Sequence, residues 1–364
     1  MRYGIAGVVL VLVGIVFRLL EGPGGGYRPS VLPLGWSADG SLLFVHREEE
    51  GGYDWRRYSC GGSGVYALAE GSVPKPVFTG ARWCDSVPFP GAGGPTLSRD
   101  SRTLFAVGRS QNYCGEVVAA DIRRQQSKTV WRDCSATMDE AAVSPDGRWV
   151  VGQQSCSLRS GGGEPPQILP RGCVEGDSRL HVAPLRGGAA RSIGTAELRS
   201  PVWSPDSRAI LAEREDGRIV RVDLATGEQR TVTEGYDPAW SPDGRWIAFT
   251  RWEGGGKGFV STLRVARIDG SGERALFTDQ EGWFANMETR TNGSPRAPLW
   301  SPDGQRIVFV RAHHRGGTLW SVRRDGTDLR RLTRPIPRMT HAPPSAFSAA
   351  GGALSGRADA AAHL

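Results

Sequence analysis

A strand, a tight turn and a second strand are encoded by the stretch Leu299-Trp300-Ser301-Pro302-Asp303-Gly304-Gln305-Arg306-Ile307-Val308-Phe309-Val310. Proline at the second turn position presets φ, aspartate hydrogen-bonds to the neighbouring backbone, and glycine adopts the left-handed conformation that ends the turn. The β-branched and aromatic residues that follow favour a strand. The stretch therefore predicts a β-hairpin.

The same hairpin pattern occurs six times along the chain. The copies share a large apolar residue before the serine and an apolar run after the turn, and they begin at Trp36, Leu97, Val143, Trp203, Trp240 and Trp300. A strand-rich repeat of about 40 residues is typical of a β-propeller, in which each blade is a four-stranded sheet. We therefore predict an all-β fold, a six-bladed β-propeller of four-stranded antiparallel blades over residues 31–334. The intervals longer than about 40 residues are explained by loop insertions.

The last blade carries a second motif. After its hairpin, the expected strand at Leu319 to Val322 leads to Asp325-Gly326 and then to Leu332-Thr333. Together with the Trp-Ser-Pro-Asp-Gly turns, this pattern resembles the TolB-like propeller repeat, also called the PD40 or WD40-like repeat. The resemblance covers most of residues 30–334 and is strongest in blades four to six. In blades one and two, Ala38 and Arg99 stand where the family pattern has proline.

The C-terminal residues 335–364 are rich in Ala, Gly, Pro and Ser, and we expect them to be disordered. The segment Ser345 to Gly352 nevertheless echoes the hairpin without its aspartate. The alternative is therefore a seven-bladed propeller with a degenerate last blade.

An apolar segment precedes the repeats. Gly4 to Phe17 contains no charged residue and follows Arg2. It is shorter than the about 20 residues that a spanning helix needs, and it is similar to the apolar region of a signal peptide. We predict an uncleaved signal-anchor helix within residues 1–20, with membrane contact through residues 4–20, or alternatively a cleaved signal peptide. Either segment would place the propeller outside the cytoplasm, in the periplasm or at the outer face of the membrane, and residues 21–30 would form a glycine-rich tether.

All six cysteines lie in the first half of the chain, without C-x-x-C spacing. This usage favours disulfides in an oxidising compartment over a zinc site. Two pairs join the loop after a blade's second strand to the loop after its fourth, which emerge on the same face, and the third pair shares one insertion. The predicted disulfides are Cys60–Cys84, Cys114–Cys134 and Cys156–Cys173.

Catalytic motifs are missing from the sequence. The turn aspartates recur once per blade, so we interpret them as turn residues rather than as a converging site. The chain has no H-E-x-x-H, P-loop or EF-hand pattern, and it lacks the G-x-S-x-G motif of the peptidase domains that follow some propellers of this kind. We therefore predict a protein without metal, cofactor or enzymatic activity.

Aromatic and charged insertions form the candidate binding site. We assign them to loops on one face, between second and third strands or between blades. The residues are Tyr53, Trp55, Tyr113, Trp252, Glu253, Trp283, Phe284, His313 and His314. Aromatic side chains are enriched in binding hot spots, and loops on a rigid scaffold often carry function. Local packing of these loops is the alternative interpretation.

The predicted function is that of a monomeric, non-catalytic protein-binding scaffold in the cell envelope. An alternative is a channel-centred enzyme or a carbohydrate-binding protein that acts on an envelope glycan, with carboxylates before the first strands as candidates; these are Asp139, Glu140, Glu197 and Asp237. A structural spacer is a third possibility. The net charge is +7 and the pI about 9.3. The arginines are scattered along the chain, at turns and strand ends, so we expect no nucleic-acid partner.

Overall fold

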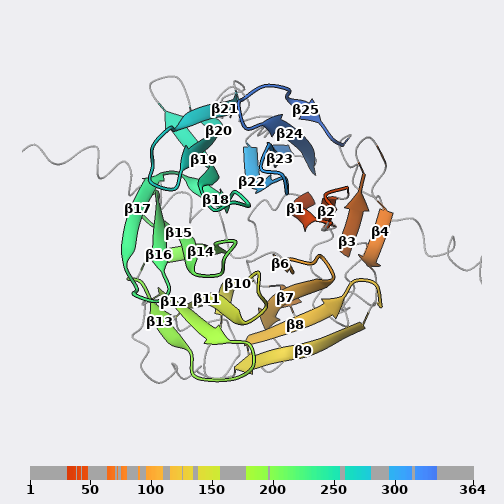
Figure 1. Cartoon of the computed structure of the whole chain (residues 1–364), viewed down its shortest axis with the longest axis vertical. Helices are drawn as coiled ribbons and strands as arrows, with labels where there is room; N and C mark the ends of the chain where they lie inside the picture. The colour runs from red at the N-terminus through yellow and green to blue at the C-terminus, as the bar shows by residue number, and fades with distance from the viewer. Residues whose placement is uncertain are drawn as a thin grey trace, which may run out of the picture.

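Six antiparallel sheets, five with four strands and one with five, form a closed ring in a computed structural model of the chain (Figure 1). The structure describes residues 31–37, 39–41, 43–47, 64–69, 72, 75–79, 89–90, 96–109, 115–124, 126–133, 138–155, 178–195, 197–254, 259–279, 295–313 and 316–333. Each sheet contains one of the six sequence repeats, which confirms the six-bladed propeller. The predicted anchor helix, the tether and the segment Ser345 to Gly352 lie outside the described residues.

The first three blades are consecutive in sequence. Blade one comprises β1 (Val31–Trp36), β2 (Leu43–Arg47), β3 (Gly64–Leu68) and β4 (Lys75–Thr79). Blade two comprises β5 (Phe89–Pro90), β6 (Thr96–Leu97), β7 (Thr103–Arg109), β8 (Gly115–Asp121) and β9 (Gln126–Asp133). Blade three comprises β10 (Met138–Val143), β11 (Trp149–Ser155), β12 (Ser178–Pro184) and β13 (Arg191–Ile193). The innermost position of blade two is divided between β5 and β6, which both pair with β7.

The last three blades follow the same order. Blade four comprises β14 (Leu198–Trp203), β15 (Ala209–Arg214), β16 (Arg218–Asp223) and β17 (Gln229–Glu234). Blade five comprises β18 (Tyr236–Trp240), β19 (Trp246–Gly254), β20 (Phe259–Arg267) and β21 (Arg274–Thr278). Blade six comprises β22 (Pro295–Trp300), β23 (Arg306–His313), β24 (Gly316–Arg323) and β25 (Arg330–Arg331). The first strand of every blade lies nearest the centre of the ring and the last strand at its rim (Figure 1).

Antiparallel pairing divides the ring into two faces. The turns between first and second strands and between third and fourth strands emerge on one face, which we call the turn face. Connections between second and third strands and between blades emerge on the opposite face, which we call the loop face. Backbone hydrogen bonds join the two turns of a blade, as in Leu185 N to Arg148 O at 2.8 Å and Leu224 N to Arg208 O at 3.0 Å.

Apolar packing between blades forms the core. Six clusters of buried side chains each join two neighbouring blades, including the contact between blade six and blade one. Val151 and Leu180 of blade three, for example, pack with Ile210 and Val220 of blade four, and all four are at most 1% exposed. Because strands alternate their side chains, each blade has one apolar set for each neighbour. The ring is therefore held together by the burial of both faces of every blade.

Candidate functional site

The repeated turn is held by hydrogen bonds within its own hairpin. Ser301 Oγ donates to Asp303 Oδ1 at 2.5 Å, and the backbone nitrogen of Gln305 donates to the same oxygen at 3.0 Å. Gly304 has φ of +66°, the left-handed value that the sequence predicts at this position. The Ser301 hydroxyl is the main reason that the pKa of Asp303 lies below its ordinary value. The aspartate is therefore an ionised turn residue, as predicted from the repeat.

The other hairpins repeat this geometry, including those without glycine. Ser101 and Ser207 occupy the glycine position and have φ of 57° and 60°. Neighbouring turns also touch, because Ser101 Oγ donates to Trp36 O at 2.5 Å and Asp146 N donates to Ser207 Oγ at 3.3 Å. The turn of blade two is thus linked to blade one, and the turn of blade three to the turn of blade four.

A cavity of about 610 Å³ lies on the turn face between blades four and five. We call it the blade 4–5 groove. Its lining includes Pro205 and Asp206 from the turn of blade four and Trp240 from blade five. Arginine side chains of three different strands or turns also line it, namely Arg99, Arg221 and Arg230. The groove therefore combines apolar walls with guanidinium groups, and Arg99 comes from blade two.

The carboxylates of the groove act as hydrogen-bond acceptors inside their own turns. Asp206 Oδ1 accepts from Ser204 Oγ at 2.6 Å, and Asp243 Oδ1 accepts from Ser241 Oγ at 2.5 Å. Burial raises the pKa of both carboxyls, but these hydroxyls and the following backbone N–H groups outweigh it, so both pKa values are lowered. A lowered pKa is the opposite of what a general acid at neutral pH requires.

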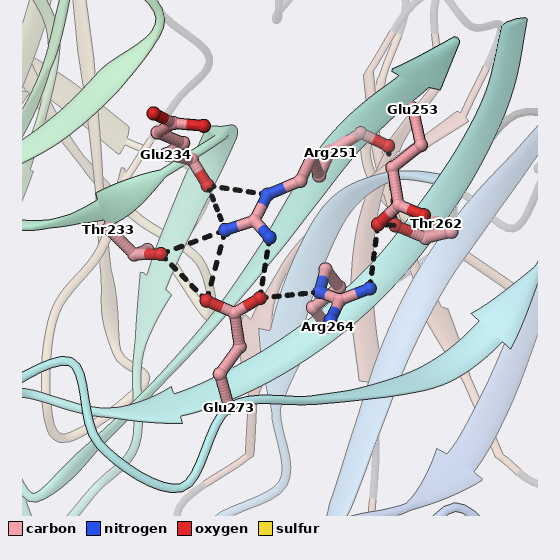
Figure 2. Close-up of polar contacts among 7 residues, drawn as sticks. All are labelled: Thr233, Glu234, Arg251, Glu253, Thr262, Arg264 and Glu273. Carbon is pink, nitrogen blue, oxygen red and sulfur yellow. Dashed lines mark hydrogen bonds and ion pairs between the residues drawn. The ribbon is translucent and has the colours of Figure 1, made fainter. Parts of the chain in front are cut away.

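An ion-pair network joins blade four to blade five (Figure 2). Arg251 donates to the Glu273 carboxylate at 2.6 and 3.0 Å, and to the Thr233 hydroxyl of blade four at 2.9 Å. Arg264 donates to Glu273 at 2.8 Å and to Glu253 at 2.7 Å. Burial raises the pKa of Glu273, but the hydrogen bonds from Arg251 and Thr233 outweigh it, so its pKa is lowered. The network is a fully paired connection between blades.

Strand pairing in blade five changes the placement of two predicted loop residues. Trp252 and Glu253 were expected in a loop, but both lie in β19, where they pair with Ser261 and Val260 of β20. The strand continues this far because β20 supplies a partner up to Phe259. Glu253 accepts a hydrogen bond from Arg264, so it has a structural role in the network.

His313 also lies on a strand rather than in a loop. It is the last residue of β23 and pairs with Gly316 of β24. The remaining predicted binding residues lie outside the described part of the chain; they are Tyr53, Trp55, Tyr113, Trp283, Phe284 and His314. So do all six cysteines of the predicted disulfides, Cys60, Cys84, Cys114, Cys134, Cys156 and Cys173.

Most of the carboxylates considered for a channel enzyme lie within first strands. Asp139 and Glu140 lie within β10 and Asp237 lies within β18, whereas Glu197 directly precedes β14. The expectation that all four precede first strands is therefore wrong for three of them. Asp237 is at an irregularity of β18 with φ of 50°, and its backbone nitrogen donates to buried Glu213 of blade four at 2.7 Å. Its position is thus fixed by contact between blades.

Sequence patterns did not identify the groove. Its walls come from blades four and five, and Arg99 comes from the hairpin of blade two. The one available signal was the arginine at position 99, which stands where blades three to six have proline. In the part of the chain that the structure describes, no group of three His, Cys, Asp or Glu side chains is placed to hold a metal ion. Within the same residues there is no helix of the length and apolar character needed to cross a membrane.

Comparison with known proteins gives one match among curated sequences. Tricorn protease homolog 1 of Streptomyces coelicolor is 25% identical over an alignment of 192 residues, which covers 46% of this chain. The alignment covers only 17% of that protein, so the chain spans a small part of the relative that it matches. No protein-family model matches the chain.

Solved structures show the same architecture at low sequence identity. TolB from Acinetobacter baumannii superposes with a TM-score of 0.52 at 14% identity, covering 89% of this chain and 69% of TolB. An oligogalacturonate lyase from Vibrio parahaemolyticus gives a TM-score of 0.53 at 15% identity, covering 85% and 78% of the two chains. An oligogalacturonate lyase in complex with manganese gives 0.51 at 17% identity, covering 84% and 78%. Repeat pattern and structure agree, and the chain has a TolB-like β-propeller fold.

Proposed function

We propose that this protein is a non-catalytic scaffold of the cell envelope that binds a partner protein in the blade 4–5 groove. The observation that carries the proposal is the groove itself, about 610 Å³ in volume and placed between two rigid blades. This volume is within the range of about 300–1,000 Å³ that ligand pockets occupy. It accommodates a few side chains of a docked polypeptide.

The composition of the groove favours a protein ligand. Trp240 and Ile268 supply apolar surface, and Arg221 and Arg230 supply guanidinium groups at the outer end. Tryptophan and arginine are the residue types most enriched in binding hot spots of protein interfaces. The groove thus offers one anchor for an apolar side chain and several donors for carbonyl or carboxylate groups.

The state of the groove carboxylates supports binding over catalysis. Asp206 and Asp243 are held by serine hydroxyls and have lowered pKa values. They accept hydrogen bonds within their turns, and the pKa of each is lowered, whereas an acid–base pair requires one carboxyl with a raised pKa. The alternative of a glycan-directed enzyme draws on the lyases that share the fold, and it is tested below.

Location in the envelope is proposed from the sequence. The apolar segment Gly4 to Phe17 and the even number of cysteines favour export to an oxidising compartment. The predicted loop-face residues, of which Trp252, Glu253 and His313 are described, remain a second candidate surface for the partner.

Crosslinking of the full-length protein to envelope extract, followed by mass spectrometry, tests the proposal. We expect one protein to be captured, with crosslinks that map to blades four and five. The variant Arg221→Ala/Arg230→Ala should lose the partner, whereas Arg179→Ala/Arg218→Ala, which removes two exposed arginines elsewhere, should retain it. If the Trp252→Ala variant loses the partner and the Arg221→Ala/Arg230→Ala variant retains it, binding is assigned to the loop face instead.

A negative result is equally informative. If the wild-type protein captures no protein above the level of the Arg221→Ala/Arg230→Ala variant, the scaffold function is rejected. Degradation of oligogalacturonate by the purified protein, with and without manganese, would then establish the enzymatic alternative. Activity in that assay would also reject the proposal by itself.

A further inference from the structure

The fold gathers arginines that are scattered in the sequence. On the turn face of blades two and three, six exposed arginines follow or flank the turns, namely Arg102, Arg123, Arg124, Arg148, Arg186 and Arg191. We call this surface the blade 2–3 arginine patch. Ile122 N donates to Arg102 O at 3.0 Å and Leu185 N donates to Arg148 O at 2.8 Å, so the two turns of each blade lie side by side. These arginines, which are distant in sequence, therefore share the turn face of two adjacent blades.

The two blades that carry the patch pack directly against each other. Phe105 and Val117 of blade two share an apolar cluster with Val143, Val150 and Leu185 of blade three. A Cβ atom built on Gly147, in the turn of blade three, would lie 3.7 Å from the ring of Phe105. The turns that carry the arginines thus belong to two blades that pack against each other.

The carboxylates of the acidic residues beside the patch accept hydrogen bonds within their own turns. Asp121 Oδ1 accepts from the backbone nitrogens of Arg123 and Arg124 at 2.9 and 2.8 Å. Asp100 accepts from Ser98 Oγ at 2.6 Å, and Asp146 accepts from Ser144 Oγ at 2.5 Å. The turn geometry therefore uses these carboxylates as acceptors for backbone and serine groups.

The guanidinium groups make few close ion pairs inside the patch. In the described residues of these two blades, Arg124 and Arg148 approach Asp121 and Asp146 only to 4.0 Å. Arg191 donates to the carbonyl oxygen of Leu224 at 2.6 Å and remains exposed. Guanidinium forks of this kind match carboxylates in bidentate geometry. The patch can therefore bind additional carboxylates.

An exposed tryptophan lies within the patch. Trp149 directly follows Arg148 and is 36% exposed, which is unusual for a large apolar side chain in this fold. An exposed indole on a face that also carries arginines has the composition of an interface hot spot. A lipid-binding surface gains affinity by inserting several apolar side chains, and Trp149 is the one large apolar side chain exposed on the described part of this patch.

We propose that the blade 2–3 arginine patch binds an acidic, extended segment of the partner protein, with carboxylates on the arginines and an apolar side chain on Trp149. This inference rests on the proposed protein-binding function and adds the chemistry of the partner. It also places a second contact on the turn face, which carries the blade 4–5 groove.

Binding of fluorescein-labelled decaglutamate to the full-length protein, followed by fluorescence anisotropy, tests the patch. The variant Arg123→Gln/Arg124→Gln/Arg186→Gln should weaken binding about tenfold, since each exposed pair contributes modestly. The control Arg179→Gln/Arg218→Gln/Arg323→Gln removes the same charge outside the patch and should stay within about twofold of the wild type. Binding should also weaken as salt rises.

Three outcomes of the binding assays would overturn the inference. They are no binding of decaglutamate, equal weakening in the patch variant and the control, or binding to phosphatidylglycerol vesicles without binding to decaglutamate, which would identify a membrane surface. The crosslinking experiment separates this inference from the scaffold function. If the patch variant retains the partner that the wild type captures, the scaffold function stands and the patch is excluded.

Discussion

The indole nitrogen of Trp300 donates a hydrogen bond to the carbonyl oxygen of Ala239 over 3.1 Å, which joins blade six to blade five. Equivalent bonds join Trp240 to Val202 at 3.2 Å and Trp203 to Ala142 at 3.0 Å. The tryptophan that opens each of these repeats therefore also fixes its blade to the preceding blade.

Blade one differs at the equivalent position. The indole nitrogen of Trp36 is buried and has no hydrogen-bond partner among the described residues. Contact between blade six and blade one is instead apolar, through side chains such as Val45, Leu68 and Val310. Trp300 and Trp36 thus form a matched pair, since Trp300 makes the indole hydrogen bond and Trp36 does not.

Replacement of these tryptophans by phenylalanine should separate the hydrogen bond from the packing. Trp300→Phe leaves the Ala239 carbonyl without its donor, whereas Trp36→Phe removes no hydrogen bond. We expect Trp300→Phe to lower the free energy of unfolding by about 1–2 kcal/mol more than Trp36→Phe, as measured by urea denaturation. Equal losses would show that the indole bond contributes nothing between blades.

Two glycines allow backbone strain and steric overlap to be measured separately. Gly244 has φ of +68°, and a Cβ atom there would meet nothing within 4 Å. Gly270 has φ of +86°, and its Cβ atom would lie 2.5 Å from the backbone oxygen of Val232 in the neighbouring blade. Gly244→Ala should cost about 1–2 kcal/mol through its left-handed conformation alone.

Gly270→Ala should cost more than Gly244→Ala, because blade four or the turn of blade five must shift. Thermal unfolding of the two variants provides the comparison, with the change in midpoint as the readout. A smaller effect at Gly270 than at Gly244 would contradict the close approach of blades four and five at this turn.

The turn aspartates predict how stability depends on pH. The pKa of Asp303 is below its ordinary value of 3.8, so its ionised form is favoured in the folded protein. Its contribution to stability is therefore complete above about pH 4 and is lost as the pH falls through the folded-state pKa. Asp39 behaves in the same way, because Ser37 and Ser41 lower its pKa to about 2.

The variant Asp303→Asn keeps an oxygen acceptor for Ser301 and Gln305 but removes the titration. We expect its free energy of unfolding to decline less steeply than that of the wild type between about pH 5 and pH 2. Urea denaturation at a series of pH values checks this. A slope identical to that of the wild type would mean that the Ser301 hydrogen bond does not favour the ionised carboxylate.

The network of Glu273 should stabilise the contact between blades four and five (Figure 2). Its side chain and that of Arg251 are each 22% exposed, so solvent screens the ion pair only in part. Glu273→Gln should lower the free energy of unfolding by about 1–2 kcal/mol, since two arginines lose a charged acceptor. Glu228→Gln is the control, because its pair with Arg230 is 54% and 72% exposed and should change stability by at most about 0.5 kcal/mol.

A double-mutant cycle with Arg251→Gln would assign the effect to the pair. A coupling energy near zero between Glu273 and Arg251 would show that the network does not stabilise the contact between blades.

The repeat was sufficient to predict the blades but not the surfaces between them. The turns at Ser101 and Ser207 follow the glycine-containing copies because serine, aspartate and backbone N–H groups of one hairpin determine the local geometry. Trp252 and Glu253 were assigned to a loop because strand length depends on the partner strand β20, which the local pattern does not report. The binding role predicted for the aromatic residues in the long insertions stays a prediction.

The sequence by itself determined the turn, its period and therefore the number of blades, because these depend on interactions within about ten residues of the chain. Only the tertiary structure decided which distant side chains meet. Arrangement of the blades in a ring brings Arg99 to the blade 4–5 groove, and packing of neighbouring blades brings Arg251 to Thr233. These neighbours are set by the packing of whole blades, and a pattern that recurs in every blade does not report which blades and side chains meet.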